Sequence, residues 1–64
     1  MTYEDECKLG RQYATQVIAD TRATGDLPKF VRTVRDMAGA EDGVAVGFMF
    51  EMGKRLIDEN SIWL

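Results

Sequence analysis

Cys7 is the residue of this 64-residue sequence best suited to nucleophilic chemistry, and it is the only cysteine. It lies near the expected start of a helix with Lys8 and Arg11 close by, a setting that can make a thiol reactive. Cys7 also falls on an apolar helical stripe with acidic neighbours, which is typical of a packed structural cysteine. We therefore expect a structural role for it.

The carboxylates are the next candidates for chemistry, because the sequence contains no histidine to act as a general acid or base. Glu4, Asp5 and Glu6 are adjacent, so on a helix they splay around the axis and do not form a paired acid site. Glu41 and Asp42 precede a glycine but lack the alternating ligands of a calcium loop. The sequence therefore predicts a protein that is not an enzyme and that holds no metal and no cofactor.

The glycines do not form a phosphate-binding loop. Gly43, Gly47 and Gly53 are regularly spaced, but the lysine and hydroxyl pair and the preceding strand of such a loop are missing. Gly43 and Gly47 are four residues apart, which favours close packing of a second helix on that strip. Gly10 lies within an expected helix, where it costs about 1 kcal/mol relative to alanine. We interpret Gly10 as a point where another backbone approaches closely.

The small size of the chain limits how its fold can be stabilised. A chain of this length buries only about 60% of the surface that it exposes when unfolded, so residues 1–64 form a single domain at most. Small domains of this kind often depend on disulfides, a metal or a partner subunit. With one cysteine and no histidine, an internal disulfide is impossible and metal ligands are few. Of these three kinds of support, association with a second copy or with another protein is the one that the sequence leaves open.

The distribution of charged and apolar residues predicts a cytoplasmic protein. Residues 1–6 are acidic and polar, where a secretory signal would need a basic region followed by an apolar run. The longest apolar stretch, residues 44–50, is too short to span a bilayer. We therefore expect neither export nor membrane insertion.

Apolar periodicity and helix signals predict an all-α fold. We expect helices at about 3–24, 27–38 and 41–59, followed by a short C-terminal tail. Thr2 and Asp5 form a capping box at the first start, and Gly25 ends that helix. Pro28 suits the first turn of the second helix, and Gly39 marks its end.

The third segment is ambiguous, because residues 44–50 match a buried strand as well as a buried helix. A single strand would have no partner in this chain. The apolar pattern continues to Ile57, and Glu51 and Arg55 form an i,i+4 pair, so we favour a helix.

This third helix is apolar on two faces, and a domain of three helices can bury only one of them well. The second face is therefore the predicted surface for a partner or for a dimer. The contact surface that we expect comprises Val46, Phe48, Met49, Phe50, Met52, Ile57 and Trp63. An alternative is that the tail, Ser61–Leu64, folds back over this face, so Trp63 is either a lid on the core or an exposed anchor.

We hypothesise that the protein is a small, non-enzymatic protein–protein interaction module that binds itself or a foreign target, with a homo-oligomer expected. Very short acidic helical proteins are common among phage and mobile-element products that block a host complex such as a bacterial immune effector. This analogy rests on the fold alone and not on any shared motif.

Two other functions stay open. A dimeric regulator resembling a helix-turn-helix protein would place Lys29, Arg32 and Arg35 on DNA, and the same residues suit an acidic partner. The net charge of −3 makes nucleic acid the less favoured partner. A structural subunit of a homo-oligomer is the other alternative.

Overall fold

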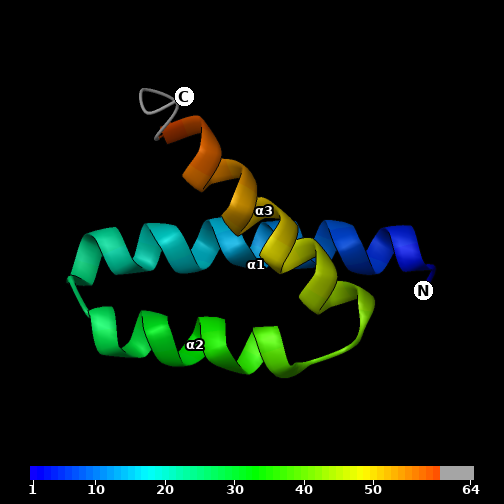
Figure 1. Cartoon of the computed structure of the whole chain (residues 1–64), viewed down its shortest axis with the longest axis horizontal. Helices are drawn as coiled ribbons and strands as arrows, with labels where there is room; N and C mark the ends of the chain where they lie inside the picture. Colours follow the sequence, from blue (N-terminus) through cyan, green and yellow to red (C-terminus); the bar gives the residue numbers. More distant parts are fainter. Residues whose placement is uncertain (60–64) are drawn as a thin grey trace.

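The computed structural model of the protein describes residues 1–59 as three helices (Figure 1). They are α1 (Tyr3–Thr24), α2 (Leu27–Gly39) and α3 (Gly43–Glu59). No strand occurs in this part of the chain, of which 88% is helical, so the predicted all-α fold of three helices is confirmed. Residues 44–50 belong to α3, which confirms the helix that the sequence pattern favoured over a strand. The predicted tail, with Trp63, lies outside the described residues.

Most helix ends follow the signals in the sequence, but α3 begins at Gly43, two residues later than predicted. The Thr2 hydroxyl accepts a hydrogen bond from the Asp5 amide at 3.2 Å, and the Thr2 amide donates to the Asp5 carboxylate at 3.3 Å. Gly25 ends α1 in the left-handed conformation with φ 71°. The second helix continues through Gly39 and ends at Ala40, which is extended, so the predicted boundary is one residue early.

The three helices form two layers. α1 and α2 run side by side in opposite directions, and α3 crosses α1 on one side of that pair (Figure 1). The molecule measures 34 × 28 × 19 Å, and its short dimension equals about two helix diameters. Each helix therefore has a side on which no other helix of the described residues lies.

Glycines bring the backbones of α1 and α3 into contact where the helices cross. A Cβ atom at Gly10 would lie 2.6 Å from the backbone nitrogen of Phe48. A Cβ atom at Gly47 would lie 2.7 Å from the carbonyl carbon of Cys7. The interpretation of Gly10 as a point of close backbone approach is confirmed. The helix that packs on Gly47 and on its neighbour Gly43 is α1 of the same chain.

The core lies at this crossing. The buried apolar residues are Ala14, Ala45, Phe48 and Met52. The Phe48 ring also meets the ring of Tyr13, with centroids 5.4 Å apart. The second helix contributes no fully buried residue and covers the core with partly buried Phe30, Val34 and Met37. The fold therefore depends chiefly on the contact between α1 and α3.

Candidate functional site

The face of α3 that points away from α1 is apolar and open to solvent. We call it the outer face of α3, and it consists of Val46, Met49, Phe50, Gly53 and Ile57. These positions are spaced three and four residues apart, so they share one side of the helix. Phe50 and Ile57 are each 64% exposed, and Val46 is 42% exposed. Apolar side chains of this size normally account for much of a small core, so their exposure marks a candidate interaction surface.

The structure divides the predicted interface between two sides of α3. Val46, Met49, Phe50 and Ile57 lie on the outer face and are exposed. Assigning Phe48 and Met52 to the interface is wrong, because they are 0% and 8% exposed and pack on Ala14. The seventh residue, Trp63, lies outside the described part of the chain.

Which face of α3 is buried depends on which side of the helix makes the close contact with α1. Gly43 and Gly47 lie against α1 and draw Phe48 and Met52 inwards with them. Leu56 is 62% exposed but lies on the side of Met52, where it lines a hollow with Ile18 of α1 and Leu27 of α2.

Gly53 lies in the middle of the outer face and forms the floor of a shallow hollow of about 430 Å³. The side chains of Met49, Phe50 and Ile57 surround it. A Cβ atom at Gly53 would meet nothing within 4 Å. A glycine inside a helix costs about 1 kcal/mol relative to alanine. The contacts within the chain that explain Gly10 and Gly47 therefore do not explain Gly53.

Charged side chains border the outer face. The Arg11 guanidinium of α1 lies 5.7 Å from the centroid of the Phe50 ring, within cation–π range. Lys54 and Asp58 line the hollow at Gly53. On the inner side of α3, the predicted pair is present: Arg55 Nε donates to the Glu51 carboxylate at 3.0 Å. The outer face therefore has an apolar middle and a charged border, as protein interfaces commonly do.

Cys7 lies in α1 beside aromatic and charged side chains. Its thiol is free and half-buried, and it lines a hollow with Tyr3, Glu4, Lys8 and Arg11. The pKa of the Tyr3 phenol is raised, first by Coulombic repulsion from Cys7 and then by desolvation, a hydrogen bond with Cys7 and the charge of Glu6. The backbone of Cys7 lies against Gly47, so this residue takes part in the helix crossing.

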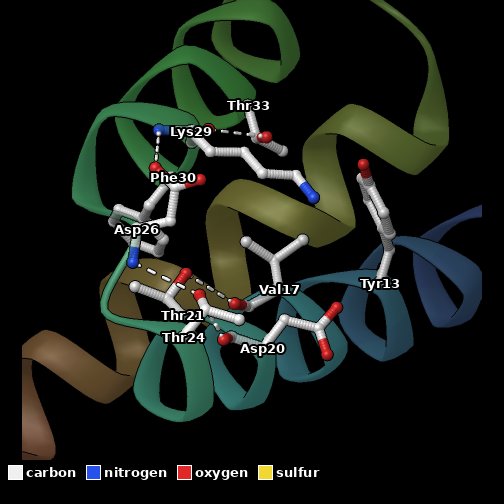
Figure 2. A pocket seen from close by; sticks show the side chains of 9 residues that line it. All are labelled: Tyr13, Val17, Asp20, Thr21, Thr24, Asp26, Lys29, Phe30 and Thr33. Atoms are coloured by element: carbon white, nitrogen blue, oxygen red, sulfur yellow. Dashed lines mark hydrogen bonds between the residues drawn. The ribbon is translucent and has the colours of Figure 1, made fainter.

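A cleft of about 240 Å³ separates α1 from α2 (Figure 2). Several of its polar side chains bond to nearby groups. The Thr21 hydroxyl donates to the carbonyl of Val17 at 2.8 Å, and the Thr33 hydroxyl donates to the carbonyl of Lys29 at 2.9 Å. The Asp26 carboxylate accepts the Lys29 amide at 3.1 Å and caps α2. These hydrogen bonds stabilise the turns and ends of α1 and α2. The bonded groups do not point toward a common position in the cleft.

The basic residues of α2 border two different hollows. Lys29 lines the cleft of Figure 2, where its side chain extends across the opening. Arg32 and Arg35 line a hollow on the far side of α2, together with Leu27, Pro28 and Val31. Leu27 is 62% exposed and Val31 is 52% exposed, so this hollow is partly apolar. The predicted DNA contact therefore does not form one uniform basic surface.

Residues 1–59 contain neither a candidate metal site nor a candidate membrane-spanning helix. No group of three or more histidine, cysteine, aspartate or glutamate side chains there could hold a metal ion. Within the same range, every helix lacks the length or the apolar character needed to cross a membrane. Comparison of the chain with protein-family models, with curated proteins and with solved structures found no match.

Proposed function

We propose that this protein is an interaction module that performs no chemistry of its own and binds another protein chain through the outer face of α3. The observation that carries the proposal is the solvent exposure of Phe50 and Ile57, at 64% each, beside the glycine hollow. Burying an apolar side chain of this size stabilises a complex by about 1.5–3 kcal/mol before the entropic cost of association. Two such side chains on one face give a partner a substantial driving force.

The residue types also support the proposal. Phenylalanine and methionine are enriched where protein surfaces meet, and methionine adapts its shape to a partner. Arg11 and Lys54 border the face with long side chains whose charged ends remain in water. A partner can therefore bury the apolar middle of the face without burying these charges.

The proposed activity is to cover a surface of the partner. A chain this small gains most of its effect by occluding a site on a larger complex, as a phage or mobile-element inhibitor of a host protein would do. A cytoplasmic setting fits the free thiol of Cys7, because reducing compartments keep cysteines unpaired.

Exchanging Phe50 for aspartate should abolish partner binding, because it places an unpaired charge in the middle of the contact surface. The measurement is affinity capture from the native cell with quantitative mass spectrometry, which counts both foreign proteins and untagged copies of the chain. We expect each specific partner to fall by about tenfold or more with Phe50→Asp, which corresponds to about 1.4 kcal/mol or more.

Val31→Asp is the matched control, because Val31 is also an exposed apolar residue but lies on α2. Its recovery of partners should equal that of the natural chain. Circular dichroism must show that both variants keep their helices. Unchanged recovery with a folded Phe50→Asp variant would rule out the outer face of α3 as the binding surface.

Duplex DNA should not bind this protein, even at low salt. Arg32 and Arg35 are exposed, but the net charge of −3 makes the long-range electrostatic energy unfavourable. A mobility-shift assay at about 50 mM salt checks this, since nonspecific DNA binding is tightest at low salt. Binding that weakens steeply with added salt and is lost with Arg32→Ala would instead support the DNA-binding regulator.

A further inference from the structure

The hollow at Gly53 has the form of a gap that receives one side chain of another helix. Its lining includes four residues spaced i, i+3, i+4 and i+7, namely Phe50, Gly53, Lys54 and Ile57. Four residues of one helix form the hole into which a packed partner helix inserts a single side chain. Gly53 contributes no side chain to this gap, and a Cβ atom there would meet nothing within 4 Å. The gap can therefore admit a large apolar side chain.

A second gap of the same spacing lies one turn earlier on the outer face. It is formed by Val46, Met49, Phe50 and Gly53, so the two gaps share Phe50 and Gly53. Their centres are four residues apart, which is about 6 Å along the helix. Residues three or four apart on a helix lie on one face at a similar separation. A partner helix that lies along α3 therefore reaches both gaps with two side chains at this spacing.

The charges beside the two gaps favour carboxylates on the partner. Arg11 lies over Phe50, and Lys54 forms one side of the gap at Gly53. Neither cation forms an ion pair within residues 1–59. Asp58 lines the far end of the hollow and is the one carboxylate among its described lining residues. An acidic side chain beside each inserted apolar residue would pair the two cations at the edge of the contact.

The charge of the whole chain limits how acidic the partner can be. The net charge of −3 repels a strongly acidic protein at long range. We therefore expect the acidic residues of the partner to be few and to lie at the contact with Arg11 and Lys54. A second copy of the chain suits the surface less well, because packing at Gly53 would bring the two Lys54 side chains together.

We propose that the outer face of α3 binds a helix of a foreign protein that carries two large apolar side chains three or four residues apart, each with an acidic side chain beside it. This inference rests on the proposed function and names the chemistry of the partner. It assigns Gly53 the role of admitting one of the two apolar side chains.

A display library of helical peptides tests the chemistry of the partner. The probe is an alanine-rich helix of about 20 residues, long enough to be helical alone, with one face randomised. It is selected on the immobilised natural chain, and peptides that also bind Phe50→Asp are removed. We expect the enriched peptides to carry leucine, phenylalanine, methionine or tryptophan at two positions three or four apart. Aspartate or glutamate should be enriched beside these positions.

Variants of the chain test the gap and the charge separately, with fluorescence polarisation of one enriched peptide as the measurement. Gly53→Leu fills the gap and should weaken binding about tenfold or more. Gly39→Leu is the matched control, because a Cβ atom at Gly39 also meets nothing within 4 Å and Gly39 lies on α2. It should bind like the natural chain. Lys54→Glu should reverse the charge preference, so that it binds the peptide better once lysine replaces the peptide's acidic residues.

The proposal is overturned if no peptide is enriched, or if the enriched peptides lack the apolar pair or carry basic residues beside it. Equal binding to folded Gly53→Leu and to the natural chain also overturns it. So does a purified chain that sediments at twice 7.2 kDa and returns to 7.2 kDa with Phe50→Asp, because a second copy then occupies the outer face.

Failure of this inference is distinguishable from failure of the proposed function. Affinity capture with Phe50→Asp uses the natural partners and does not depend on the peptide library. If Phe50→Asp abolishes capture but the selected peptides do not show the expected pattern, the outer face remains the binding surface and its partner has a different chemistry.

Discussion

Replacing Gly10 by alanine should destabilise the fold by about 2 kcal/mol, although alanine is the better helix former. The added Cβ atom would lie 2.6 Å from the Phe48 nitrogen and in collision with the carbonyl oxygen of Val44. Both are backbone atoms of α3, so neither can turn aside, and the two helices must separate. For a domain of this size we expect the Tm to fall by on the order of 10 °C, measured by circular dichroism.

Gly39→Ala is the control for the Gly10 result. Gly39 is also helical, its φ is negative, and a Cβ atom there meets nothing within 4 Å. Alanine should leave the Tm unchanged or raise it slightly, with a gain of at most about 1 kcal/mol. A Gly10→Ala variant as stable as Gly39→Ala would mean that α1 and α3 do not approach at the observed distance.

Truncating Phe48 to alanine should unfold the protein at room temperature. Phe48 is 0% exposed at the centre of the core, and removing a buried phenylalanine side chain costs about 3–5 kcal/mol. A single core in a chain of this length supplies about as much stability in total. We expect the cooperative thermal transition and most of the helical circular dichroism signal to disappear.

Phe50→Ala is a matched control, since it changes the same residue type two positions further along α3. Phe50 is 64% exposed, so its truncation should cost about 1 kcal/mol or less in the monomer, chiefly by loss of the contact with Arg11. Dilute samples keep self-association from contributing. Similar losses for the two variants would show that the two faces of α3 are assigned wrongly.

These two phenylalanines illustrate how α3 separates stability from recognition. Its inner side holds Phe48 and Met52 against α1, and its outer face presents Phe50 and Ile57 to solvent. A substitution on one side should therefore alter folding, and a substitution on the other should alter binding. This separation is what makes the interface testable in such a small protein.

The sequence by itself determined the helices, because the signals for them are local. Thr2 and Asp5 cap α1 through bonds that span three residues, and Gly25 ends it with a conformation that glycine adopts readily. The apolar pattern of α3, continued past residue 50, was enough to favour a helix over a strand. The exact end of α2 was missed by one residue, since Gly39 and Ala40 can each end it.

Only the tertiary structure decided which apolar face of α3 is buried. Both faces have suitable side chains, and periodicity does not rank one above the other. The choice follows from contact between distant residues: Gly10 meets Val44 and Phe48, and Gly47 meets Cys7. Close approach of the two backbones turns Phe48 and Met52 inwards, because they share that side of the helix. Phe50 and Ile57 lie on the other side, and no helix within residues 1–59 covers them.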